Sequence, residues 1–221
     1  MTFDFAFAWE VLPQLLGALR VTILATVLGM ALAAVLGLLW TALRRSPLRA
    51  LSGLTRVWIE FIRSTPVLVQ IYFLFYMLPD FGLSLSPMMA GVLALGVHYS
   101  AYLAEVYRSG IESVPKGQWE ASRSLNLSPL QTWRLVILPQ AIPPVVPAFG
   151  NYFIAMFKDT PMLSAITVLE LLQTAKIIGS ETFRYLEPLT MVGVLFLILS
   201  LVASAGVRWT ERRLGRVAAR A

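Results

Sequence analysis

The residues of this sequence that could take part in chemistry are few, and most suit binding rather than catalysis. One histidine and no cysteine are present, which leaves neither a Cys/His metal cluster nor a thiol nucleophile. A phosphate-cradling G-x-x-x-x-G-K-[ST] loop and a G-x-S-x-G nucleophile turn are also missing. We therefore expect no catalytic residue, no metal site and no ATP bound by this chain.

Ionisable residues within apolar runs are candidates for a solute path, because a charge in lipid is expensive and is usually functional. Lys158 and Asp159 follow an apolar stretch, and Asn151 shares a helix face with Lys158. A helix that starts near Pro147 places Lys158 about 17 Å along it, near mid-bilayer, whereas a start near Pro139 places it toward the outer surface. The alternative is an internal ion pair or a contact that stabilises a kink.

Further path candidates lie in two other apolar runs. Glu60 and Arg63 are spaced i, i+3 and can pair within their own helix, as can Glu105 and Arg108. If the first of these runs serves function instead, its polar residues face a central pathway and contact or gate a zwitterionic solute; they are Glu60, Arg63, Thr65 and Gln70. A polar contact between helices is the alternative for the histidine in this set. The candidates in these two runs are Glu60, Arg63, Thr65, Gln70, His98 and Tyr99.

A polar island over residues 112–139 interrupts the apolar runs, as expected where a membrane protein meets water. Ser113 can cap a short helix and Pro115 fits its first turn. Asn126 tolerates the left-handed conformation that ends a helix. The island is therefore predicted to hold a short helix that docks onto another surface, the alternative being an amphipathic helix that rests on lipid headgroups.

Small and acidic residues recur within this island at a recognisable spacing: Glu120-Ala121-Ser122, Asn126, Val136 and Leu138-Pro139. The spacing resembles the EAA motif of permease subunits in ABC importers, written E-A-A, three residues, G, nine residues, I, one residue, L-P. Ser122, Asn126 and Val136 replace Ala, Gly and Ile, and each change is mild. Flanking segments are similar to the polar amino-acid uptake branch: Arg63-Ser64-Thr65-Pro66, Tyr102-Leu103-Ala104-Glu105, Val114-Pro115-Lys116-Gly117-Gln118 and Lys158-Asp159-Thr160.

This resemblance implies a type I ABC importer permease fold and three kinds of partner. They are a cytoplasmic ABC ATPase dimer that binds ATP and Mg, a second permease subunit that is a homologue or a copy of this chain, and an extracytoplasmic solute-binding protein. In the family, the short helix inserts into a cleft on the ATPase. The residues expected to couple to the ATPase are Lys116, Gly117, Trp119, Glu120, Ala121, Ser122, Asn126 and Pro139.

The resemblance also implies the class of solute, a polar amino acid or a related small zwitterion. Ser124-Leu125-Asn126 and residues 155–161 are somewhat similar to permeases for ectoine and hydroxyectoine. The sequence leaves open which solute is carried and whether the two permeases are identical.

Composition independently indicates a membrane protein. With 57% hydrophobic and 14% charged residues and a mean hydropathy of +0.72, the chain of 221 residues is too apolar for a soluble domain and too long for one span. The net charge of +6 does not indicate nucleic-acid binding, because the cations lie between and after the hydrophobic runs. We expect an all-α, polytopic, single transmembrane permease domain over residues 1–221.

About five transmembrane helices are predicted, with the N-terminus outside and the C-terminus in the cytoplasm. Arg44, Arg45 and Arg49 follow the first apolar run, which places that loop in the cytoplasm by the positive-inside rule. The expected location is the bacterial cytoplasmic (inner) membrane. The predicted spans are 15–43, 57–78, 83–106, 145–172 and 188–207, and the cytoplasmic coupling loop is 109–143.

Two other functions compete with an ABC permease. The first is an autonomous channel or secondary carrier, which the lack of an internal repeat disfavours, since five spans cannot form two equal inverted halves. The second is a membrane enzyme or assembly factor, for which the sequence offers no convincing set of acids or ligands.

Overall fold

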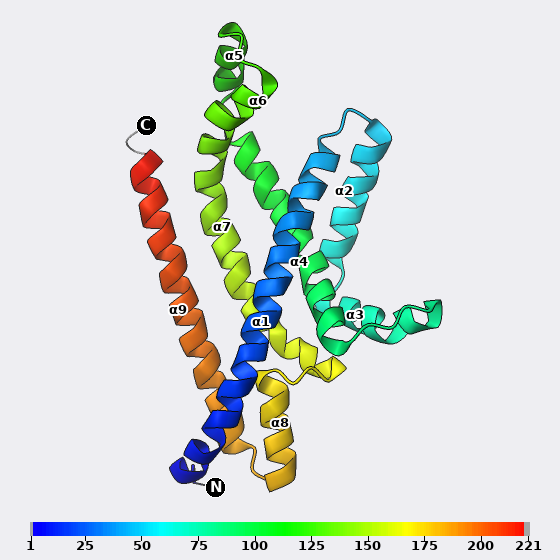
Figure 1. Cartoon of the computed structure of the whole chain (residues 1–221), viewed down its shortest axis with the longest axis vertical. Coiled ribbons are helices and arrows are strands. Elements are labelled where there is room, and N and C mark those ends of the chain that lie inside the picture. Colours follow the sequence, from blue (N-terminus) through cyan, green and yellow to red (C-terminus); the bar gives the residue numbers. More distant parts are fainter. Residues whose placement is uncertain (1, 219–221) are drawn as a thin grey trace.

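The computed structural model describes residues 2–218, with side chains to residue 213, and its regular structure in this range is helical throughout (Figure 1). The segments η1 and η3 are π-helices, and η2 and η4 are 3-10 helices. In chain order the elements are α1 Phe5–Arg44, α2 Arg49–Ser64, α3 Val67–Tyr72, η1 Phe73–Met77, η2 Leu78–Phe81, α4 Pro87–Glu112, α5 Lys116–Ser124, α6 Pro129–Gln131, η3 Thr132–Ile137, α7 Leu138–Asp159, η4 Thr160–Ile166, α8 Leu171–Thr182 and α9 Leu186–Ala218.

Within residues 2–213, three helices are long and apolar enough to cross a membrane: Phe5–Arg44, Pro87–Glu112 and Leu186–Arg213. Two further helix pairs meet this criterion together but are bent, which gives up to five crossings. The predictions of an all-α, polytopic protein with about five transmembrane helices are therefore confirmed.

Helix α1 packs against α4 and α7 through glycines. A Cβ added to Gly37 would lie 3.0 Å from Leu103 Cβ, and one added to Gly29 would lie 3.1 Å from Met156 Sδ. Small residues allow helices to approach closely where lipid supplies no hydrophobic driving force. The largest buried cluster of the described residues joins α1, α3, α4, α7 and η4 and includes the fully buried Leu95.

The second apolar run differs from the continuous helix expected over 57–78. The helix starts earlier, at Arg49, ends at Ser64, and the chain then bends by 103° into Val67–Phe81. Pro66 explains the bend, because the residue before a proline is disfavoured in helical geometry, and Thr65 adopts the extended conformation. The Gln70 amide then donates to the Thr65 Oγ1 at 2.6 Å, which stabilises the bend.

The fourth apolar run differs too. Helix α7 begins at Leu138 rather than near Pro147, and three prolines lie inside it. The predicted break before Pro161 is present: α7 ends at Asp159, η4 follows, and Thr167 adopts a left-handed φ of 62°. The chain resumes as α8 with a 48° bend, so 145–172 is not one continuous helix.

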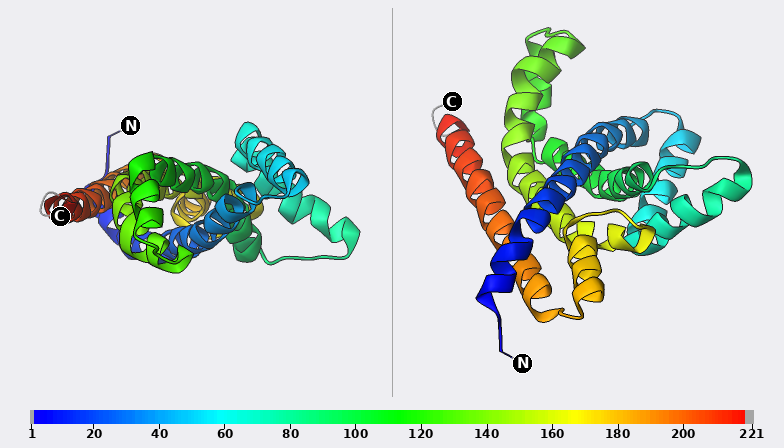
Figure 2. Two further views of the ribbon diagram at one scale, coloured as in Figure 1. Left: turned by 90° about the horizontal axis from the view of Figure 1, so that it is seen from above. Right: turned by 60° about the horizontal axis from the view of Figure 1, so that its bottom comes forward.

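The short helices α5 and α6 share one end of the bundle with the loop between α1 and α2 and with the end of α9 (Figure 1). The beginning of α1 and the helix α8 lie at the opposite end, as the second view of Figure 2 also shows. The loop between α1 and α2 holds Arg45 and Arg49 borders it, so these cations and the expected docking helix lie toward the same end. The side of the membrane on which this end lies stays a prediction from the positive-inside rule.

Candidate functional site

The expected docking helix is α5, and its capping differs in part from the prediction. Ser113 does not cap it: this residue ends α4, and its hydroxyl donates to the Gly110 carbonyl at 2.7 Å. Pro115 precedes the first residue of α5, where a missing backbone N–H is tolerated. Asn126 adopts the predicted left-handed conformation, with φ of 52°, and turns the chain toward α6. The short helix and its left-handed end therefore follow from local sequence preferences.

The outer surface of this segment is polar with two exposed leucines. Leu125 and Leu130 are 73% and 75% exposed at the end of the molecule that carries α5 and α6. The expected coupling residues on this outer surface are Lys116, Gly117, Glu120 and Ala121, and Asn126 and Pro139 are exposed as well.

Two expected coupling residues point toward the chain itself. Ser122 is 1% exposed, and its hydroxyl donates to the Gln118 carbonyl at 2.7 Å. Trp119 meets Trp133 of η3 edge to face, with ring centroids 5.4 Å apart. Together with the buried Ile137, these contacts tie α5 to the start of α7. The segment from α5 to η3 therefore has an exposed outer surface and a packed inner one.

A second candidate region lies in the middle of the bundle. The Tyr99 hydroxyl donates to Asp159 Oδ2 at 2.6 Å, which joins α4 to the end of α7. Tyr99 also belongs to an aromatic cluster that His98, Tyr102 and Tyr152 complete. Tyr99 stands near the midpoint of the helix Pro87–Glu112, so Asp159 lies beside the middle of α4.

Lys158 lies in the last turn of α7, directly before Asp159, and α7 begins at Leu138, close to the second of the two predicted starts. The depth of Lys158 in a membrane stays a prediction. Lys158 and Asn151 are both exposed, as expected for residues that share a helix face. Lys158 has no ion-pair partner within residues 2–213.

Arg63 reaches the aromatic cluster from α2. Its guanidinium carbon lies 5.3 Å from the centroid of the Tyr102 ring, and the Tyr102 hydroxyl donates to the Arg63 carbonyl at 3.3 Å. Arg63 also lies 3.6 Å from Glu60, the expected intrahelical pair, whose carboxylate is 69% exposed. Thr65 and Gln70 bond to each other at the bend between α2 and α3. They therefore stabilise the bend that follows Arg63.

The structure brings Arg63, His98, Tyr99 and Asp159 together and adds two residues that the sequence reasoning did not select. Tyr102 follows Tyr99 by one helical turn, so its spacing could have indicated it. Tyr152 comes from α7, and its ring centroid lies 5.4 Å from that of Tyr102. No local pattern predicts that meeting, because it depends on how α4 and α7 pack.

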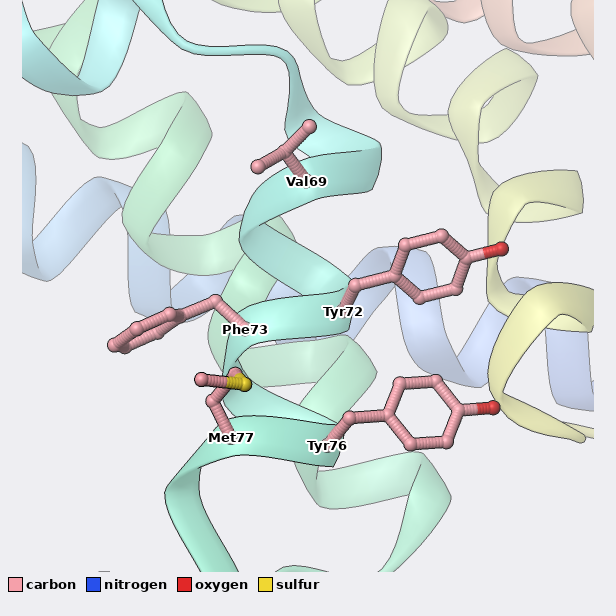
Figure 3. Close-up of a pocket in the computed structure, with 5 residues that line it drawn as sticks. All are labelled: Val69, Tyr72, Phe73, Tyr76 and Met77. Carbon is pink, nitrogen blue, oxygen red and sulfur yellow. The ribbon is translucent and has the colours of Figure 1, made fainter. Parts of the chain in front are cut away.

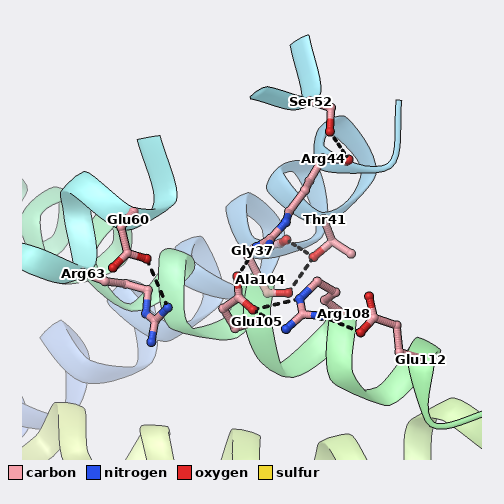
Figure 4. A network of polar contacts seen from close by, with 10 residues as sticks. All are labelled: Gly37, Thr41, Arg44, Ser52, Glu60, Arg63, Ala104, Glu105, Arg108 and Glu112. Atoms are coloured by element: carbon pink, nitrogen blue, oxygen red, sulfur yellow. Dashed lines mark hydrogen bonds and ion pairs between the residues drawn. The ribbon is translucent and has the colours of Figure 1, made fainter. Parts of the chain in front are cut away.

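Charged residues also link α1 to α4 nearer the α5 end (Figure 4). Arg108 pairs with Glu105 at 2.8 Å, which confirms the expected intrahelical pair, and Arg44 joins Glu105 from α1. The Thr41 hydroxyl donates to the Ala104 carbonyl at 3.2 Å. Glu112 pairs with Arg108 as well, so every charge in this network has a partner. The network holds the two helices together without leaving an uncompensated charge.

Helix α3 and η1 form an apolar arm on the side of the molecule, with an open hollow of about 450 Å³ (Figure 3). The Tyr76 hydroxyl donates to the Ala165 carbonyl at 3.3 Å, so part of the arm rests on η4. The hollow has no titratable group other than tyrosine, so it offers no charge to a zwitterion. Its lining residues are Val69, Tyr72, Phe73, Tyr76 and Met77.

Comparison with known proteins places these features in context. Residues 33–216 match the family model described as "Binding-protein-dependent transport system inner membrane component". The probable amino-acid ABC transporter permease protein y4tG of Sinorhizobium fredii (strain NBRC 101917 / NGR234) is 51% identical over 205 residues, which cover 93% of this chain and 89% of the relative. The glutamine transport system permease protein GlnP of Escherichia coli (strain K12) is 37% identical over 97% of this chain and 99% of its own.

The fold has a close match among solved structures. A chain in the crystal structure of an amino acid ABC transporter with histidines superposes with a TM-score of 0.90 at 36% identity, covering 96% of this chain and 100% of that one.

Proposed function

Because the chain belongs to the family of binding-protein-dependent transport system inner membrane components, we propose that it lines the translocation pathway of an importer driven through α5 by a separate ATPase. It is a multi-pass permease subunit of an ABC importer for amino acids. Four further points belong to this proposal: the contact with the ATPase, the residues that line the pathway, the other partner proteins, and the orientation of the chain in a bacterial cytoplasmic membrane. The N-terminus would lie outside and the C-terminus in the cytoplasm.

The exposed outer surface of α5 is the observation that carries the ATPase contact. Glu120 and Ala121 stand there beside the exposed Leu125, while Trp119 fixes the helix to η3 from the inner side. A rigid helix with an exposed, mostly polar outer surface can enter a cleft and transmit a displacement to the helices that flank it. ATP and Mg would be bound by the ATPase dimer, and this chain would bind neither.

The aromatic cluster beside the middle of α4 is the proposed solute contact. A zwitterion needs an anionic partner for its ammonium and a cationic one for its carboxylate, and Asp159 and Arg63 supply these charges beside Tyr102 and Tyr99. The exposed side chains of Lys158 and Asn151 would face a second permease, a homologue or a copy of this chain, and the pathway would run between the two subunits. A solute-binding protein would deliver the solute from outside.

The solute proposed is a polar amino acid. One relative is named a glutamine transport system permease, and the opposite charges near the aromatic cluster suit any amino acid with free ammonium and carboxylate groups. An ectoine-type compatible solute carries the same two charges, so it remains a competing outcome to be tested directly.

Reconstitution tests this function. The chain would be placed in vesicles with its candidate ATPase and solute-binding protein, and uptake of labelled glutamine, histidine and ectoine would be followed with and without ATP. ATP-dependent uptake of an amino acid is expected. Uptake by the lone chain that follows an ion gradient and ignores ATP would instead indicate a secondary carrier.

A charge reversal on α5 tests the ATPase contact. Glu120→Lys should abolish ATP-coupled uptake while the chain stays in the membrane, because a cation would then face the partner surface. Glu120→Gln keeps the side-chain size, so it should reduce coupling less than the reversal does. Unchanged coupling in Glu120→Lys would show that α5 is not the docking helix.

A further inference from the structure

Two adjacent arginines at the end of α1 reach two different parts of the molecule. Arg44 pairs with Glu105 on α4. The guanidinium carbon of Arg45 lies 5.7 Å from the centroid of the Trp133 ring on η3. The short loop to α2 is fixed here as well, because the Ser52 hydroxyl donates to the Arg44 carbonyl at 2.6 Å. The end of α1 is thus in contact with both segments that flank the α5 region.

The contact of Arg45 continues to α5 through one aromatic pair. Trp133 stands edge to face with Trp119 at 5.4 Å and an interplanar angle of 85°. The end of α1 is therefore connected to α5 through three side chains in succession: Arg45, Trp133 and Trp119. A cation over an indole ring is attracted by the negative face of the ring, and Trp gives the strongest such contact of the aromatic residues.

The aromatic pair stands on an unusual piece of helix. Trp133 lies in the π-helix Thr132–Ile137, and its carbonyl accepts from the Leu138 N–H five residues later. Single-turn π-helices are rare in helical segments and are frequent at functional sites. A π turn holds one residue more than an α turn, so a displacement at α5 could be absorbed by a change of register there. A contact that fixes Trp133 from outside the turn opposes such a change.

We infer that Arg45 and Trp133 form a brace that fixes the orientation of α5 relative to α1. They are positioning residues: they make α5 and α1 move together when the ATPase displaces α5, so η3 does not bend. This inference rests on the proposed docking of α5. The brace adds α1 to the two long helices, α4 and α7, that flank the α5 segment along the chain. Helix α1 packs against both of them.

A spin label on α5 tests the brace without any partner. The chain has no cysteine, and a Cβ added at Gly117 would have no heavy atom within 4 Å among the described residues, so Gly117→Cys can carry the label. In the permease alone, in lipid nanodiscs, Arg45→Ala and Trp133→Leu should each raise the mobility of the label. Arg45→Lys keeps a cation over the ring and should restore most of the order.

The matched control is Arg49→Ala, which removes one exposed arginine beside the same loop. Arg49 has no ion pair or ring contact within residues 2–213, so the label should keep its mobility. Because Arg45 and Trp133 act as one unit, the double variant should match the larger single effect rather than the sum. Trp133→Phe keeps an aromatic face and provides a second variant if Trp133→Leu does not fold.

The second measurement uses unlabelled variants in the reconstituted importer. Arg45→Ala should lower the amount of solute taken up per ATP hydrolysed by about two- to fivefold, the range that an exposed cation–π contact supports, with the affinity for the ATPase unchanged. Equal label mobility in wild type and Arg45→Ala, or additive effects of Arg45→Ala and Trp133→Leu, would overturn the brace. If the wild-type chain fails to bind an ATPase, the proposed function fails, and the label in the permease alone still decides on the brace.

Discussion

Substitution of Gly110 tests how closely α4 and α7 must approach. Gly110 is buried two residues before the end of α4, and a Cβ added to it would lie 2.3 Å from Val145 Cγ2 and 2.8 Å from the Ala141 carbonyl oxygen. The Val145 side chain can rotate away. The Ala141 carbonyl belongs to the backbone of α7, so Gly110→Ala must push the two helices apart.

The size of the effect follows from these distances. An ordinary contact begins at 3.4 Å, so the carbonyl must move by 0.6 Å, the difference between 3.4 and 2.8 Å. Overpacking of a close contact costs about 1–3 kcal/mol, and the better helix propensity of Ala offsets up to ~1 kcal/mol. A net loss of roughly 1–2 kcal/mol corresponds to a fall in Tm of about 2–8 °C for a chain of this length.

Thermal unfolding of the purified chain, followed by tryptophan fluorescence, measures this loss. The double variant Gly110→Ala/Val145→Ala removes the side-chain clash but not the carbonyl clash, so it should recover only part of the stability. Gly53→Ala is the control, because a Cβ there would have no heavy atom within 4 Å in the described part of the chain, and its Tm should not fall. A Tm of Gly110→Ala equal to or above that of the wild type would refute the close approach of the two helices.

Two further predictions concern the middle of the molecule and the end that carries the start of α1. Tyr99→Phe removes the donor to Asp159, so it should cost about 1–3 kcal/mol and raise the KM for uptake, measured beside the Tm. At the start of α1, the Phe7 N–H and the Arg184 guanidinium hold the pKa of Asp4 below its usual range. Because this pKa is lowered in the folded state, the stability from Asp4 is present above the unfolded pKa of about 3.9 and is lost as the pH falls through the lowered value. Asp4→Asn should remove this part of the acid sensitivity in unfolding titrations, and an unchanged acid limb would contradict the assignment.

Local chemistry allowed much of the coupling segment to be predicted from sequence. The left-handed Asn126 and the short helix before it depend on residues within a few positions of one another. Hydropathy indicated the helical membrane class for the same reason, since a long apolar run needs no partner to be recognised.

Prolines show where prediction from sequence reached its limit. Pro66 ends a helix and accompanies a 103° bend, whereas Pro147 lies inside α7 without ending it. Local rules treat both as helix breakers. Packing decides between the two outcomes: α7 is held on either side by contacts at Gly110 of α4 and at Gly150, whose added Cβ would lie 2.5 Å from Val207 of α9. The contact of Tyr152 with Tyr102 was unpredictable on the same ground, because it depends on the rotation of two helices.

The glycine contacts between α1 and α4 have a consequence for how the permease changes shape. With 3.0 Å from the place of a Cβ on Gly37 to Leu103 Cβ, the two helices have no room to slide past each other without separating. They form one rigid body, and the parts of the subunit that can bend are then the two interrupted segments, at Pro66 and at Thr160–Ile166. Both interruptions adjoin residues that contact the tyrosines: Arg63 before the first contacts Tyr102, and Asp159 before the second bonds to Tyr99. We therefore expect a swing of either segment to shift the tyrosine cluster.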